Sequence, residues 1–434
     1  MTASYGAACA RVKRTRTFAL VNPVLALGLL AVAGLLAARL SRPSSRRPPS
    51  LDLAITAGAP LVLLGLLAGP GIELLSPPLA RALAPLTACA IGWIGAAFGA
   101  RFEWRSARRI PRGAWLLAAA GAGAAFLVVA LGAWLFARRA PSLAAAWAPR
   151  LPAVLGLAAV AAASGPGPVS AVARRVGVAP RLARALGRAA ALETACAALA
   201  MSVPLGLRHP VSWPIFALGS GALVGLGFSG VTGHTRAGQD VTPALAGTVL
   251  FGAGIGYATD LSPFMVCALA GVVMVNASPR RRAVRAALRA WERPSCALLL
   301  IMSGALLMLS TLWIPAAVAV LGVLRAGARW LSVRYARVAL SLRDLPPQLG
   351  LGTVAQGGTA LALAVNYFLM YGGRAETGPD AGAAVLTTMV LGVALALFTA
   401  PPLMRLAARG AGAVDTRPRA PRAYGQRAGG TDRA

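Results

Sequence analysis

Residues 161–170 read AAASGPGPVS, so an apolar run meets Gly165, Pro166, Gly167 and Pro168 in succession. Proline removes a backbone N–H donor and glycine lowers helix propensity, so a helix that reaches this point is predicted to unwind. The flanking residues are as apolar as a membrane span. In lipid, non-helical backbone is tolerated only where protein or a water-filled cavity satisfies its polar groups. The break therefore points to a buried site of the kind that membrane transporters form at the bilayer midplane.

The composition of the whole chain agrees with a membrane environment. Of the 434 residues, 57% are hydrophobic and 13% are charged, and the mean hydropathy is +0.68. These values predict an all-α polytopic protein of the cell (inner) membrane, with the lipid bilayer as a partner. The net charge of +31 would suggest nucleic acid, but the arginines lie in short loops between apolar spans. We therefore expect positive-inside topology and no nucleic-acid partner.

About thirteen transmembrane helices are predicted when about 20 apolar residues are taken as one crossing. Basic residues alternate in number between successive loops, with 10 on one side, 32 on the other, and Arg325 inside a span. This asymmetry predicts an extracytoplasmic N-terminus and a cytoplasmic C-terminus. The basic stretch 279–294 fits a solvated loop better than an amphipathic helix on the leaflet. The predicted spans are 18–38, 53–70, 82–100, 114–137, 151–173, 186–206, 212–233, 241–259, 261–278, 295–313, 315–333, 348–371 and 381–404.

A second interruption is predicted in the twelfth span, where residues 349–367 read LGLGTVAQGGTALALAVNY. Gly357 and Gly358 at mid-length cost a helix about 2 kcal/mol relative to alanines. The alternative is that these glycines allow close helix packing. The two breaks fall in the fifth and twelfth spans, and an odd offset makes the two broken spans cross the membrane in opposite directions. The pattern predicts inverted repeats with two discontinuous helices that cross near the midplane.

Several segments, in order along the chain, resemble motifs of one family. AASGPGPVSAVARRVG at 162–177 is similar to an unwound "ATSPAVV" helix, and AQGGTALAL at 355–363 is similar to "AQGGEFAFVL". LSPFMVCALAGVVMVN at 261–276 is similar to "LSPALGAFLAGVLL". On these segments, which are collinear within residues 20–405, the chain resembles the monovalent cation:proton antiporter superfamily. The likeness is to its Kef-type and sodium/proton exchanger-like membrane domain, as a divergent member.

This resemblance implies a secondary transporter that exchanges a monovalent cation, Na+ or K+, for protons by alternating access, in a homodimer. Together with the predicted spans, the charge asymmetry and the Gly-, Pro- and Arg-rich composition of the last residues, it divides the chain into a short basic extracytoplasmic tail (1–17), a transmembrane antiporter-like domain (18–411) and a disordered cytoplasmic tail (412–434). The alignment places Glu193 on the family's essential aspartate. Thr359 replaces the glutamate that follows Gly-Gly in the family. Acidic residues are therefore fewer than in ordinary members.

Glu193 is the acid that lies well inside a predicted span, and an intramembrane acid is a functional-site hypothesis by default. It is expected to bind either a proton or a cation, or else to form a fixed ion pair with Arg188 or an arginine of a neighbouring helix. Arg325 is the expected charge partner, although it could instead extend to the cytoplasmic end of its helix. The remaining oxygen ligands are expected from the side chains of Ser164, Thr194, Thr359 and Gln356.

Two other functions fit the residues. The loss of acids favours a non-transporting regulatory or assembly member of the same fold, and the arginine-rich spans favour an anionic or neutral solute. An enzyme is not expected, because the chain has no G-x-G-x-x-G after a strand, no P-loop and no H-E-x-x-H. Neither a cofactor nor a metal site is predicted. His234 is a weak candidate for a pH sensor, and His209 is expected to be structural.

Overall fold

The structure is a computed structural model that describes residue 28 and residues 58–71, 75, 79, 82–139, 151–207, 209, 212–233, 240–308, 313–339, 346–372 and 379–410. Apart from residue 28, the predicted span 18–38 lies outside the described residues, as do the tails 1–17 and 412–434 and His234.

The described elements are helices, and they follow the predicted spans. Each of the twelve spans predicted from 53–70 onward contains a helix or a broken pair of helices. The first ten helical elements are α4 (Ala59–Leu66), η1 (Leu67–Gly71), α6 (Ala84–Gly99), α7 (Trp104–Ala107), α8 (Arg112–Arg139), α10 (Leu151–Ala162), α11 (Pro166–Val176), α12 (Pro180–Gly206), α13 (Trp213–Gly233) and α14 (Thr242–Ala258). The rest are α15 (Pro263–Ala277), α16 (Arg281–Ala305), α17 (Trp313–Ala339), η2 (Pro347–Thr353), α18 (Gly358–Tyr371) and α19 (Pro379–Gly410).

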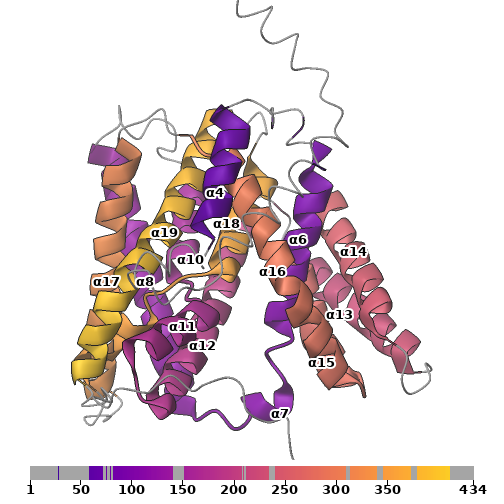
Figure 1. The fold of residues 1–434 in the computed structure, drawn as a ribbon, viewed down its shortest axis with the longest axis horizontal. Helices are drawn as coiled ribbons and strands as arrows, with labels where there is room; N and C mark the ends of the chain where they lie inside the picture. Colours follow the sequence, from indigo (N-terminus) through magenta and orange to yellow (C-terminus); the bar gives the residue numbers. More distant parts are fainter. Residues whose placement is uncertain are drawn as a thin grey trace, which may run out of the picture.

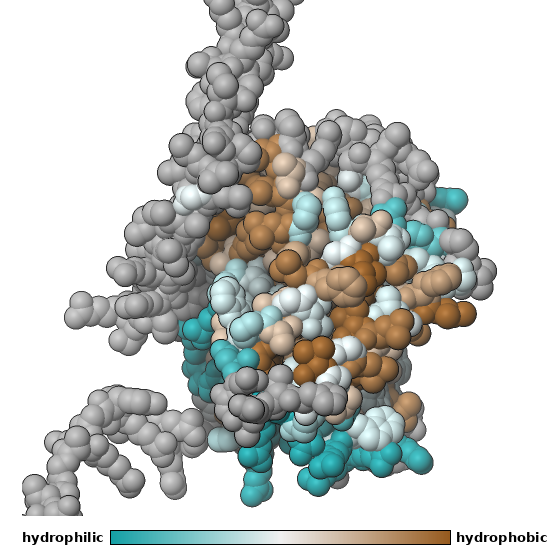
Figure 2. Space-filling view, turned by 90° about the vertical axis from the view of Figure 1, so that its right-hand side faces the viewer, coloured by the Kyte–Doolittle hydropathy of each residue, from teal (hydrophilic) through white to brown (hydrophobic). Residues whose placement is uncertain are grey.

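The lengths and composition of these helices are those of a multi-pass membrane protein. Among the described residues, five helices are long and apolar enough to cross a membrane, or six if α10 and α11 form one broken span. Five further apolar helices are shorter, at 10–17 residues. Large apolar side chains are exposed along α13, including Ile215 (72%) and Leu223 (71%), as expected of a surface that faces lipid. In Figure 2 the hydrophilic residues gather along the lower edge, and hydrophobic residues dominate the surface above them.

The helices form two bundles that lie side by side (Figure 1). The first, here called the site bundle, contains α8, α10, α11, α12, α17, η2, α18 and α19. The second, the scaffold bundle, contains α4, α6 and α13 to α16. The two bundles meet where α18 packs against α6 and α16. Both broken spans belong to the site bundle.

Small residues bring α6 and α15 close together in the scaffold bundle. A Cβ atom added to Gly99 would lie 1.8 Å from the carbonyl oxygen of Ala268, and one added to Gly271 would lie 2.3 Å from that of Ala96. The two backbones therefore touch directly. Packing of this kind is the usual means of joining helices in lipid, where burial of apolar surface gives no driving force.

The basic stretch 279–294 is mostly helical, so the expectation of a solvated loop is wrong. α16 begins at Arg281 and continues through Pro294. The stretch is amphipathic: Val284 and Leu288 are fully buried, and the Leu288 carbonyl accepts a hydrogen bond from Trp93 Nε1 at 3.0 Å. Burial of this apolar stripe against α6 gives the helix the tertiary support that its charged sequence lacks.

Candidate functional site

The first break lies at residues 163–165, between α10 and α11, whose axes are bent by 40°. Gly165 is extended, with φ −90° and ψ 108°, and α11 begins at Pro166. The two prolines thus lie in the first turn of the new helix, where an N–H has no helical acceptor and a fixed φ is favourable. The predicted unwinding is present, but the prolines start the second half-helix and do not lie in the unwound segment.

The second break lies at residues 354–357, between η2 and α18. The interruption predicted at Gly357 and Gly358 is therefore present, although the half that precedes it is a 3₁₀ helix. Six helices, α12 to α17, separate the two broken spans, so these spans run in opposite directions. Gly165 N donates to the Ala355 carbonyl at 2.8 Å, which joins the two breaks directly.

The carboxylate of Glu193 lies between the two breaks. Glu193 is 5% exposed, and it is the buried acid of the described residues. Its Oε2 lies 2.6 Å from Ser164 Oγ of the first break. Its Oε1 lies 3.1 Å from Thr353 Oγ1, which immediately precedes the second break. One side chain of α12 therefore contacts both interrupted spans.

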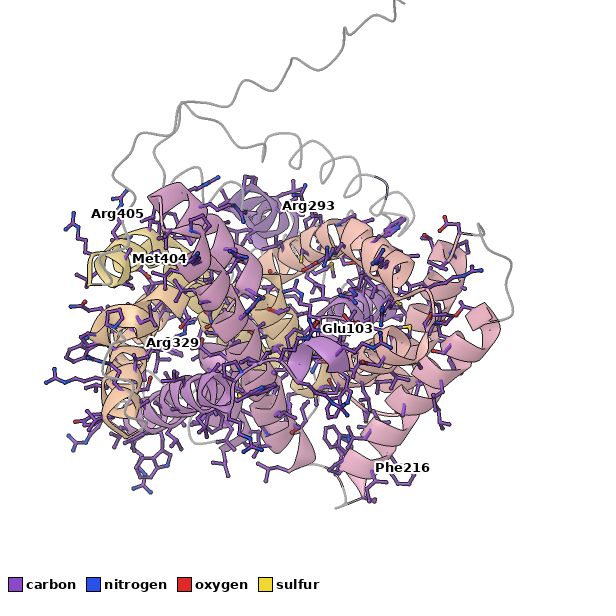
Figure 3. The ribbon with its side chains drawn as sticks, turned by 90° about the horizontal axis from the view of Figure 1, so that it is seen from below. Glu103, Phe216, Arg293, Arg329, Met404 and Arg405 are labelled. Carbon is purple, nitrogen blue, oxygen red and sulfur yellow. The ribbon has the colours of Figure 1, made fainter. Side chains whose placement is uncertain are left out.

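Arg329 of α17 forms the ion pair with Glu193. Its guanidinium is fully buried and also donates to Thr353 Oγ1 at 2.9 Å and to the Ala162 carbonyl at 2.7 Å. In Figure 3, viewed from below, Arg329 is labelled within the site bundle, whereas Glu103 lies at the end of the scaffold bundle near α7. The expected charge partner was Arg325, one turn earlier on the same helix, so this assignment is corrected.

Arg325 instead binds backbone at the broken helix ends. Its Nε donates to the Ala161 carbonyl at 2.6 Å, its Nη1 to that of Val354 at 2.7 Å, and its Nη2 to that of Ala163 at 3.0 Å. The last carbonyls of α10 have no intrahelical partner and carry the negative end of the helix dipole. A buried cation at this position therefore satisfies acceptors that the break exposes.

The other predicted ligands have different positions. Gln356 Nε2 donates to the Val160 carbonyl at 2.6 Å and so caps α10. The Thr194 hydroxyl contacts the backbone of Ser164 and the Ala190 carbonyl. Thr359 is buried in the first turn of α18, and the described contacts place no hydrogen bond between it and Glu193. His209 stacks on Trp213 at 5.6 Å, outside the site.

Sequence reasoning missed two residues of the site, Arg329 and Thr353. A signal for Arg329 was present, because residues four apart lie on one face of a helix and Arg325 was already identified. Thr353 gave no such signal, because its position depends on the 3₁₀ turn of η2. The buried site has a formal charge of +1 when Glu193, Arg325 and Arg329 are all ionised.

Two antiparallel broken helices that cross beside a buried carboxylate, in one of two helical bundles, define the fold class of sodium/proton antiporters. The chain is similar to the solved structure of the sodium proton antiporter MjNhaP1 from Methanocaldococcus jannaschii at pH 8. The TM-score is 0.65 with 18% identity, over 89% of this chain and 98% of that one. An electron-microscopy structure of the same antiporter gives a TM-score of 0.60 with 19% identity, over 90% and 96% of the chains. No family model and no curated protein matches the sequence.

Proposed function

We propose that this chain is a secondary transporter that exchanges a monovalent cation, Na+ or K+, for protons by alternating access, with Glu193 as the exchanging group. The observation that carries the proposal is the placement of Ser164 between two acceptors. Ser164 Oγ lies 2.6 Å from Glu193 Oε2 and 2.7 Å from the Thr353 carbonyl. When Glu193 is ionised, the hydroxyl donates to it; when Glu193 is protonated, the acid donates to Ser164, which then donates to Thr353. The hydrogen bonds between Glu193, Ser164 and the Thr353 carbonyl can therefore form in both protonation states of Glu193 without movement of a helix.

A cation can compete for the same oxygen atoms. The Glu193 carboxylate and the hydroxyls of Ser164 and Thr353 supply the hard oxygen ligands that a small cation requires. Arg329 holds the positive charge in the structure, and a cation would replace it at the carboxylate. The guanidinium would keep its hydrogen bonds to Thr353 and to the Ala162 carbonyl, so its release from Glu193 would not leave it without acceptors. A proton, the transported cation and the Arg329 guanidinium then compete for the Glu193 carboxylate, and each excludes the other two.

The two bundles supply the parts that alternating access requires. The breaks are joined to each other by backbone and by Arg325, so the site would move as one body with its bundle. Across the bundle boundary, the described polar contacts are few. One is the hydrogen bond of 3.0 Å between Ser262 Oγ before α15 and Asn366 Oδ1 of α18. A mostly apolar boundary favours movement of the site bundle against the scaffold bundle.

Two alternatives each have an observation in their favour. Glu193 already accepts from Arg329 and lies in hydrogen-bonding distance of Ser164 and Thr353, which fits a fixed ion pair in a non-transporting member of the fold. The formal charge of +1 at the site fits an anionic or neutral solute. Both alternatives predict that no monovalent cation dissipates a proton gradient.

The experiment uses the purified full-length chain in proteoliposomes with an imposed pH gradient. Addition of Na+ or K+ is expected to dissipate the gradient, and Glu193→Gln is expected to abolish this by removing the titrating group. Glu292→Gln is the matched control, because Glu292 pairs with Arg101 at the end of the scaffold bundle, far from the site. Dissipation that persists in Glu193→Gln removes Glu193 from the mechanism. If the unchanged chain dissipates nothing with Na+, K+ or Li+, the antiport proposal is wrong.

The orientation and assembly in the membrane are part of the same proposal. The segment that follows α6, the end of α11 and the start of α16 carry many arginines, which favours placing this face in the cytoplasm, with the N-terminus outside and the C-terminus inside the cell membrane. We also expect a homodimer. Reporter fusions at the C-terminus test the orientation, and cross-linking in native membranes tests the dimer.

A further inference from the structure

A cavity of about 420 Å³ lies between α17 and α19, with α10 and the second break behind it. Its inner wall is buried and consists of Val160 of α10, Val354 and Gln356 of the second break, and Met389 of α19. Its outer rim includes Val323, which is 73% exposed. Most of the lining is aliphatic.

The rim lies in the middle of two helices that are long and apolar enough to cross the bilayer. Val323 is near the centre of α17, and Gly392 is near the centre of α19. A cavity that opens at this depth faces the hydrocarbon core of the membrane and not water. Whatever occupies it must enter from lipid, and therefore carries an apolar chain.

The cavity is not wholly apolar, because Arg325 lines it. Arg325 is 5% exposed, and three of the five N–H donors of its guanidinium are used on backbone carbonyls. A permanent cation that borders a cavity open to hydrocarbon is complementary to an acid that can travel through hydrocarbon.

We propose that this cavity binds a long-chain fatty acid, with the carboxyl group at Arg325 and the chain along Val323 and Gly392 toward the bilayer. A fatty acid enters the hydrocarbon core in its neutral form, and its acid group is small enough to reach a residue at mid-span. The phosphate of a phospholipid is held at the interface, about 15 Å from the centre of a hydrocarbon core that is about 30 Å thick. The charge and the depth of Arg325 thus favour the single-chain acid. The site adjoins the breaks but requires no assumption about transport.

Glycine 392 offers a way to fill the cavity without disturbing the fold. A Cβ atom added to Gly392 meets nothing within 4 Å, so Gly392→Leu has room for its Cβ and adds an apolar side chain at the cavity wall. Gly327 of α17 also has open space around its Cβ but does not line the cavity, so Gly327→Leu is the matched control. Both changes replace a helical glycine and raise helix propensity equally.

The experiment measures binding of radiolabelled palmitic acid to the purified full-length chain in detergent by scintillation proximity. Saturable binding is expected for the unchanged chain and for Gly327→Leu, with at least a tenfold weaker affinity for Gly392→Leu. Methyl palmitate, which lacks the acid, is expected to compete at least tenfold less well than palmitic acid. Thermal melting of each variant checks that it is folded.

The proposal is overturned if palmitic acid binds Gly392→Leu as well as it binds the unchanged chain, because the cavity is then not the site. It is equally overturned if methyl palmitate competes as well as the acid, since Arg325 then has no part in recognition, or if saturable binding is absent. Loss of binding in both glycine variants alike would also contradict it. A chain that binds palmitic acid but exchanges no cation leaves this inference intact and removes only the proposed antiport.

Discussion

Glu193 and Arg329 form a buried pair in which each charge has further polar partners. Removal of one member of such a pair is costly, of the order of 3–5 kcal/mol, because the other charge keeps its polar partners but is left buried without a counter-charge. The same neighbourhood leaves little free space: a Cβ added to Gly121 of α8 would lie 3.0 Å from Glu193 Oε1. Close packing of α8 against the carboxylate therefore fixes where the acid can lie, and helps to keep it between the two breaks.

At the residue scale, glycine is required at position 165 because a side chain has no room there, and not because the backbone conformation favours glycine. Its φ of −90° suits any residue, but an added Cβ would lie 2.9 Å from the backbone nitrogen of Gly357. Gly165→Ala is therefore expected to separate the two breaks and to destabilise the chain by about 1–3 kcal/mol. Gly167→Ala, where nothing lies within 4 Å, is expected to be neutral or stabilising. Thermal unfolding of both variants in detergent measures the difference; equal melting temperatures would contradict the close approach.

At the scale of elements, the first half of α16 is attached by ion pairs to the segment that joins α6 to α7. Glu103 pairs with Arg281 at 3.2 Å and with Arg285 at 2.6 Å, and Arg101 pairs with Glu292 at 2.8 Å. The hydrogen bond from Arg285, together with the positive charges of Arg285 and Arg281, lowers the pKa of Glu103 below its usual range. The attachment is partly exposed, so its contribution is modest and depends on salt.

The lowered pKa predicts how this attachment depends on pH. The stabilisation from Glu103 is complete above the ordinary glutamate pKa of about 4.3 and is lost as the pH falls through the lowered pKa of the folded state. The protection factors of residues 281–293, taken relative to the intrinsic exchange rate at each pH, are therefore expected to fall below about pH 4. In Glu103→Gln, the protection factors of this segment are expected to be modestly lower already at pH 7 and to change less on acidification. If the substitution leaves the protection factors of this segment unchanged, burial of Val284 and Leu288 alone stabilises it.

At the scale of the whole molecule, the sequence predicted the fold better than it predicted the site. Periodic apolar runs and clusters of glycine and proline are local features, so the helices, the two breaks and their opposite directions could be derived from the residues and are confirmed. The partner of Glu193 is set by which turn of α17 faces α12 across the bundle. Whether Arg325 or Arg329 pairs with Glu193 depends on tertiary packing, which local sequence patterns do not predict. The basic stretch of α16 was misjudged for the same reason, since its helix depends on burial against α6.

The separation of Glu193 and Arg329 along the chain has a consequence for biogenesis. The two residues are 136 positions apart, in opposite halves of the inverted repeat. Synthesis delivers α12 to the membrane with its acid well before α17 exists, and α17 brings two buried arginines, Arg325 and Arg329, that each cost about 2.5–3.5 kcal/mol near the centre of an isolated span. In either half alone, the buried charge has no counter-charge, so each half is expected to insert poorly by itself. A chain that ends before residue 313 is therefore expected to leave α12 more accessible to protease than it is in the full chain, and equal protection in both chains would show that the first half inserts without its counterpart.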